Sequence, residues 1–208
     1  MHYFEDHELL SLLKVAYEKN RLHHLALLVS VVHGLRVSEL LALTVDDLHE
    51  ATISIRPSKR SKSAKQQSAK RVQASIEPLY RSANPLLDES QLAAHAHGVR
   101  QLAGKRLFPF CRQYADKIIR RYGAEAGIAA AKCHLHSLRH TTAMLCWSQS
   151  HSLGQITACL RHKSGAASIV YLHEVDRQKS QASLTAALNA LANVRPSESC
   201  WCNVSVRK

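Results

Sequence analysis

The stretches HGLRVSEL (residues 33–40), HSLRHTT (136–142) and LRH (160–162) decide the fold, because each combines apolar helix residues with an arginine or a histidine. Each is ordinary when taken alone. An arginine at the start of an apolar helix is usually a structural ion-pair partner, and a His-x-x-Arg pair places two side chains on one face of a helix. Tyr171, nine residues after the last of these histidines, is by itself more often a core residue than a nucleophile.

Together, these stretches supply the groups that cleavage of a phosphodiester requires when no metal or other cofactor takes part. The transition state spreads negative charge over the non-bridging oxygens, which the planar guanidinium groups of Arg36 and Arg139 can bind bidentately. A tyrosine phenol is a weak nucleophile because its pKa is about 10, so Tyr171 needs a base or a positive environment to react. His136 and His162 can orient the phosphate and move protons.

In order and spacing, these stretches resemble the motif boxes of the tyrosine recombinase (phage integrase) family. The first family box is roughly [TS]-G-L-R-x-x-E-L, the second is H-x-x-R-H, and the third is L-G-H, followed at nine residues by the nucleophilic tyrosine. The resemblance covers about residues 3–191 and implies a mainly α fold with a small antiparallel β-sheet. It also implies site-specific DNA recombination, in which DNA strands are cleaved and rejoined to integrate, excise or invert a segment.

The resemblance assigns roles residue by residue. Arg36 matches the first arginine, and His136 and Arg139 match the His-x-x-Arg pair. His162 matches the histidine of the third box, and Tyr171 matches the nucleophile that forms a 3′-phosphotyrosyl bond. Exchange is expected in a tetramer of identical chains on double-stranded DNA.

A basic hairpin is expected after the first box. Polar and apolar residues alternate in ATISI (residues 51–55) and RVQASI (71–76), which predicts two strands. Residues 56–70 between them hold six Lys or Arg residues and no acid. Such a charge run is as often a solvated loop as a binding surface. The resemblance implies a catalytic lysine on this hairpin, best matched by Lys59, with Lys62 next and Lys65 still open. The residues expected to contact DNA phosphates are Arg56, Arg60, Lys62, Lys65, Lys70 and Arg71.

Two positions depart from the family pattern. Arg161 stands where glycine is usual before the third-box histidine, and it can be tolerated at a helix end or can tilt His162 away from the phosphate. His33 replaces a small Ser or Thr, which is the milder change. Glu39 and Asp47 match positions that support the chain around Arg36 and are expected to be structural.

Domain organisation follows from where the pattern begins. It starts almost at the first residue, without the N-terminal helical DNA-binding domain that most family members carry. We expect residues 1–195 to form a catalytic domain and residues 196–208 a polar tail. Such a chain could be complete, could depend on a partner, or could be a truncated remnant. Helical periodicity predicts helices over residues 8–16, 25–32, 37–43, 92–102, 114–122, 136–147, 153–160, 168–173 and 176–192.

Composition narrows the class of partner. The 28 Lys and Arg residues exceed the 16 Asp and Glu residues, for a net charge of +12, which favours a polyanion. No secretory signal and no run of about 18 uncharged apolar residues is present, so a cytoplasmic, bacterial nucleoid-associated protein without a membrane partner is expected. The six scattered cysteines are then expected to be reduced thiols.

Two other readings stay open, and a third, a metal site, is disfavoured. A chain that binds DNA without cleaving it would be a regulator, and a type IB topoisomerase would use the same nucleophile to relax supercoils. The stretches CHLH (residues 133–136) and CLRH (159–162) offer zinc-ligand types, but they lack the paired spacing of a structural zinc site. No metal site is therefore predicted.

Overall fold

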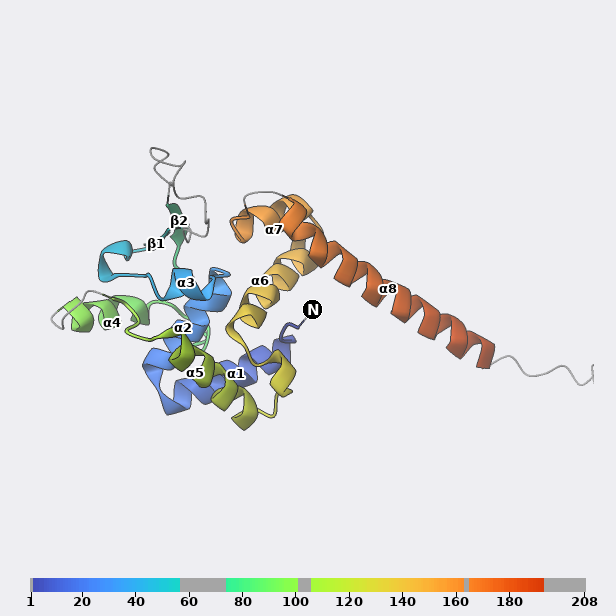
Figure 1. The fold of residues 1–208 in the computed structure, drawn as a ribbon, viewed down its shortest axis with the longest axis horizontal. Coiled ribbons are helices and arrows are strands. Elements are labelled where there is room, and N and C mark those ends of the chain that lie inside the picture. Colours follow the sequence, from blue (N-terminus) through green and yellow to red (C-terminus); the bar gives the residue numbers. More distant parts are fainter. Residues whose placement is uncertain (1, 57–73, 101–105, 163–164, 193–208) are drawn as a thin grey trace, which may run out of the picture. The chain divides into compact units, whose positions relative to one another are not determined.

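The computed structural model describes residues 2–56, 74–100, 106–162 and 165–192. The described chain is mainly helical with a small antiparallel sheet, which confirms the predicted fold class (Figure 1). It divides into two compact units, Met1–Ser168 and Ile169–Lys208, which are considered separately below. In chain order the elements are α1 (Asp6–Lys19), α2 (Arg21–Val32), α3 (Val37–Leu40), η1 (Val45–Asp47), β1 (Thr52–Ile55), β2 (Ser75–Pro78), α4 (Gln91–Arg100), α5 (Arg112–Glu125), η2 (Ala130–Lys132), α6 (Leu135–Ser150), α7 (Leu153–Cys159) and α8 (Ala166–Ala192).

Most predicted helices are present, with ends that differ by a few residues. The prediction of separate helices over residues 168–173 and 176–192 was wrong, because α8 runs through both without a break. Residues 174 and 175 are Glu and Val, so neither a glycine nor a proline interrupts the helix. The helix predicted over residues 37–43 is also shorter, since α3 ends at Leu40.

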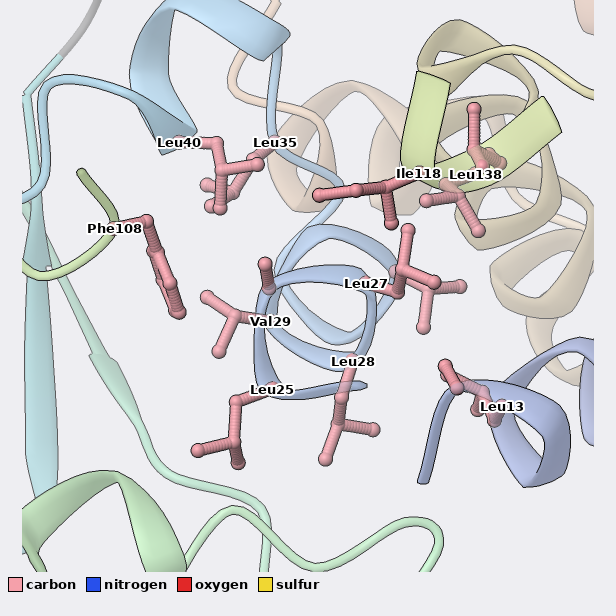
Figure 2. Close-up of a cluster of buried hydrophobic side chains, with 14 of the residues drawn as sticks. Leu13, Leu25, Leu27, Leu28, Val29, Leu35, Leu40, Phe108, Ile118 and Leu138 are labelled. Atoms are coloured by element: carbon pink, nitrogen blue, oxygen red, sulfur yellow. The ribbon is translucent and has the colours of Figure 1, made fainter. Parts of the chain in front are cut away.

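Helix α2 is the centre of the core in the first unit. Its residues 24–31 are all buried, as expected for a helix that is apolar on every side. Figure 2 shows its side chains pointing outward in several directions toward neighbouring elements. The labelled members of this buried cluster are Leu13, Leu25, Leu27, Leu28, Val29, Leu35, Leu40, Phe108, Ile118 and Leu138. Helices α1, α5 and α6 thus share one core around α2.

Gly34 ends α2 and turns the chain toward the first motif. Its φ is +53°, and the amides of Gly34 and Leu35 donate to the carbonyls of Val31 and Ser30, at 3.4 and 2.9 Å. This is a Schellman cap, in which a glycine takes the left-handed position. A Cβ at Gly34 would lie 2.8 Å from Cδ2 of Leu160, so the close packing here also favours glycine. Arg36 follows two residues later.

The sheet forms the base of the predicted hairpin. Strands β1 and β2 pair antiparallel, with Thr52 opposite Pro78 and Ile55 opposite Ser75. Ile53 and Ile55 are fully buried, which anchors β1 to the core. The second strand was expected at residues 71–76, and the described part of it begins at Ser75. The sheet therefore places Glu77, on β2, beside the core.

Candidate active site

A buried carboxylate holds the first arginine of the site. The Arg36 amide donates to Oε2 of Glu39 at 2.9 Å, and its Nη1 donates to Oε1 at 2.8 Å. The Glu39 side chain is fully buried, whereas Arg36 is about one third exposed, at 36%. Burial raises the pKa of Glu39, but hydrogen bonds from Arg36 and the charge of Arg161 outweigh burial and lower that pKa. Glu39 is therefore an anion that fixes Arg36.

Arg139, on α6, is buried and joins the three motifs. Its Nη1 donates to the Gly34 carbonyl, and its Nη2 donates to the Leu160 carbonyl at 2.6 Å. The same Nη1 lies 3.9 Å from Oε2 of Glu39. Arg36 and Arg139 thus meet at one carboxylate, although the sequence separates them by about a hundred residues.

His162 lies just after α7, and both its backbone and its side chain make hydrogen bonds. Its amide donates to the Thr157 carbonyl at 2.9 Å, and its Nδ1 lies 2.7 Å from Oγ of Ser168. Burial and the positive charges of Arg139 and Arg36 lower the pKa of His162 to about 4. The ring is therefore neutral at pH 7, with one donor and one acceptor nitrogen.

His136 lies on the first turn of α6 and lines a pocket of about 810 Å³. Partial desolvation and the charge of Arg139 lower the pKa of His136. The residues that line this pocket include Arg36, Ser38, Arg112, Gln113, His134 and His136. Sequence reasoning missed Arg112, Gln113 and His134, because nothing in their local pattern separates them from other surface residues.

Arg161 also lies beside Glu39, in the cluster of charged residues formed by Glu39, Arg36 and Arg139. Its Nη1 donates to Oε1 of Glu77 at 2.6 Å, and its Nη2 lies 3.5 Å from Oε2 of Glu39. His33 contacts the other oxygen of Glu77, with its Nδ1 at 2.8 Å from Oε2. The two departures from the family pattern therefore meet at Glu77, a residue that sequence reasoning did not single out.

The remaining predicted residues fall into three groups. Tyr171 lies on α8, in the second unit. Residues Lys59, Arg60, Lys62, Lys65, Lys70 and Arg71 lie outside the described residues. Arg56 follows β1, and its exposed Nη2 lies 2.7 Å from Oδ1 of Asp47, whose Oδ2 accepts from the amide and hydroxyl of Thr44.

No group of three or more His, Cys, Asp or Glu side chains within residues 2–56, 74–100, 106–162 and 165–192 is arranged to hold a metal ion. Across that same part of the chain, every helix is too short or too polar to cross a bilayer.

Comparison with known proteins points to one family. The family model described as the phage integrase family matches residues 2–178. No curated protein matches the chain.

Several solved structures share the fold. The XerH site-specific recombinase bound to its difH substrate is 22% identical, with a TM-score of 0.63, and the match covers 82% of this chain and 50% of that one. The XerA recombinase is 23% identical, with a TM-score of 0.64, over 86% of this chain and 65% of that one. The catalytic core of lambda integrase is 18% identical, with a TM-score of 0.56, over 78% of this chain and 92% of that one. The chain thus spans about half the length of the XerH chain.

Proposed function

The chain belongs to the phage integrase family, and from that premise we propose that it is a tyrosine recombinase that cleaves and rejoins double-stranded DNA. The observation that carries the proposal is the meeting of Arg36 and Arg139 at the buried carboxylate of Glu39. Two guanidiniums held by one anion keep a fixed separation. That arrangement suits the oxygens of a phosphodiester, which need positive charge that is already in position.

In the proposed cleavage step, the phenol oxygen of Tyr171 attacks the scissile phosphorus. A bond forms between that oxygen and phosphorus, and the bond from phosphorus to the 5′ oxygen breaks. Arg36 and Arg139 offset the charge that develops on the non-bridging oxygens, while His162 and His136 orient the phosphate and move protons. The product is a 3′-phosphotyrosyl bond and a free 5′-hydroxyl.

The leaving oxygen needs a proton. We assign this role to Lys59, with Lys62 as the alternative; both belong to the segment between β1 and β2, outside the described residues. A 5′-hydroxyl from a partner strand then attacks the phosphotyrosyl bond and releases Tyr171. The phosphodiester energy is kept in the covalent intermediate, so rejoining needs no further energy source.

Binding and assembly follow from the same proposal. The XerH structure is described as bound to its difH substrate, and lambda integrase structures are described as a dimer on a core site and a tetramer on a Holliday junction. These descriptions support a tetramer of this chain on double-stranded DNA. Phosphate contacts are assigned to Arg56, Arg60, Lys62, Lys65, Lys70 and Arg71, which would supply mostly sequence-independent affinity.

The test uses a nicked suicide duplex that covers the DNA flanking the gene for this chain. Cleavage of such a duplex releases a short strand, so the covalent protein–DNA product accumulates as a slow band in a denaturing gel. Tyr171→Phe should bind the duplex normally and give no covalent band. Tyr114→Phe, an exposed tyrosine on α5, is the matched control and should give the wild-type amount.

Three outcomes would count against the proposal or redirect it. Trapping by Tyr171→Phe would show that another residue is the nucleophile. A covalent band with plasmid relaxation but no recombinant would identify a topoisomerase. DNA binding without any covalent band would identify a regulator that does not cleave.

A further inference from the structure

The backbone at Arg161 adopts a conformation that favours glycine. Its φ is +52°, in the left-handed region, where a residue with a Cβ is strained. Glycine is the usual residue at this position of the family motif. An arginine here must therefore gain enough from its side-chain contacts to offset the strain.

The Arg161 side chain makes those contacts inside the cluster. It is only 9% exposed, and its Nη1 donates to Glu77 on β2. Its Nη2 lies 3.5 Å from Glu39 and 3.5 Å from the Gly34 carbonyl. It thus reaches both the hairpin strand and the carboxylate that holds Arg36.

His33 completes the same network from the opposite side. Its ring is 2% exposed and lies between two carboxylates, Glu77 at 2.8 Å and Glu89 at 3.2 Å. Burial alone would lower the pKa of His33, but the hydrogen bonds that its ring donates to Glu77 and Glu89 raise it to about 9. At pH 7 the ring is therefore a cation, and Glu77 is shared between His33 and Arg161.

We propose that Arg161 is a positioning residue: it orients Glu39, and through Glu39 it orients Arg36, while its contact with the Glu77–His33 pair ties the arginines to β2. This inference rests on the proposed function, because positioning has meaning only if Arg36 binds a scissile phosphate. The family glycine cannot make either contact.

The carboxylate geometry supports this role. Glu39 offers Oε1 to the Arg36 guanidinium, while its Oε2 accepts from the Arg36 amide and faces both Arg139 and Arg161. If Arg161 is removed, Oε2 loses one of its positive neighbours, so the carboxylate can rotate. Rotation would move Arg36 relative to the phosphate without changing the surface that binds DNA.

The decisive variant is Arg161→Gly, since glycine accepts the left-handed backbone and removes only the side-chain contacts. We expect covalent adduct formation at saturating suicide duplex to slow by about tenfold or more, as small misplacements of a catalytic group do. Affinity for the intact duplex and the melting temperature should stay close to wild type. Arg161→Lys, which keeps a charge but reaches one oxygen at a time, should recover part of the rate.

A double variant tests whether the effect passes through the network. Glu77→Gln should also slow the adduct, and Arg161→Gly combined with Glu77→Gln should be no slower than the slower single variant. Wild-type cleavage by Arg161→Gly would overturn the inference. A rate loss matched by an equal loss of DNA affinity or of folding would overturn it too.

A measurement that does not depend on DNA cleavage separates this inference from the proposed function. The pKa of His33 can be measured by nuclear magnetic resonance, with His33→Gln used to assign its signal. Arg161→Gly should raise that pKa, because Glu77 then pairs with His33 alone. An unchanged pKa of His33 would refute the network even if the wild type forms an adduct. A raised pKa in a chain that never forms an adduct would count against the proposed function only.

Discussion

At the scale of single residues, Glu39 organises the positive charges of the site. It is buried, and three guanidiniums lie within 4 Å of it, at 2.8, 3.5 and 3.9 Å. A buried carboxylate is costly unless it is paired and hydrogen-bonded, and here the pairing also holds the arginines apart at fixed positions. The carboxylate is thus a structural residue that fixes the arginines of the proposed phosphate site.

The first prediction concerns Arg36. Arg36→Ala should slow covalent cleavage by about 10²- to 10³-fold, or roughly 2.7–4 kcal/mol, the loss seen when one oxyanion donor is removed. The measurement is the single-turnover rate on the suicide duplex. Arg120→Ala, an exposed surface arginine on α5, is the control and should cleave normally. Near-wild-type cleavage by Arg36→Ala would contradict the phosphate-binding role.

The second prediction concerns pH and His33. The pKa of His33 in the folded chain, about 9, lies above the ordinary value of 6.5. Protonation of His33 therefore stabilises the fold in full below pH 6.5, and this contribution is lost as the pH rises through 9. Its size is on the order of a few kcal/mol. Urea unfolding should show wild type losing stability between pH 7 and about 9.5, while His33→Gln, which does not titrate, changes less. Parallel losses in both chains would disprove the assignment.

At the scale of elements, α2 is the centre of the core, because its residues 24–31 are all buried and helices α1, α3, α4 and α6 pack on it. Its sequence signal was a continuous apolar run rather than an amphipathic stripe, which is typical of a fully buried helix. Asn20 begins the helix, since its side chain accepts from the amides of Leu22 and His23, and Gly34 ends it.

The third prediction follows from this burial. Leu28→Ala should lower the free energy of unfolding by roughly 2–5 kcal/mol, because it leaves a cavity in a close-packed core. Leu10→Ala on α1 is the matched control, since Leu10 is 40% exposed and Leu28 is 0% exposed. The control should change stability by about 0.5 kcal/mol or less. Chemical denaturation measures both, and equal effects would contradict the central position of α2.

The fourth prediction concerns the contact between α6 and α7. Cys146 and Cys159 are free thiols whose Sγ atoms lie 2.9 Å apart. The hydrogen bond between the two thiols lowers the pKa of Cys146, which favours its reactive thiolate form. Diamide, which takes up two electrons and two protons, should join them in a disulfide detectable by peptide mass spectrometry.

Cys159→Ser is the control for that reaction and should leave Cys146 without an intramolecular partner. If Cys146 in the wild type instead links only to cysteines of other chains, α6 and α7 do not meet as described.

At the scale of the whole molecule, the net charge of +12 predicts DNA affinity that falls steeply with salt. Replacing Lys62 and Lys65 by glutamine should reduce the slope of log affinity against log salt by about two. Arg120 and Arg121 on α5 are the control pair, since each contacts an acid one turn away. Their replacement by glutamine should leave the slope unchanged. An equal effect in both double variants would contradict a specific DNA contact by Lys62 and Lys65.

The sequence alone determined the helical class, the buried run of α2 and the residue types of the site. These features follow from local rules, because helical period and side-chain chemistry depend on residues a few positions apart. The same local rules misjudged α8, where no glycine or proline marked a break and the helix simply continues. Lys59 and its neighbours stay predictions, since they lie outside the described residues.

Only the tertiary structure decided what the two departures from the family pattern do. Arg161 was expected either to be tolerated or to disturb His162, and His33 was expected to be a mild change. Both contact Glu77, which lies 44 residues after His33 and 84 residues before Arg161. No periodicity links positions so far apart. A buried charge is stable only beside its partner, and the folded core, built around α2 and turned at Gly34, brings these partners together.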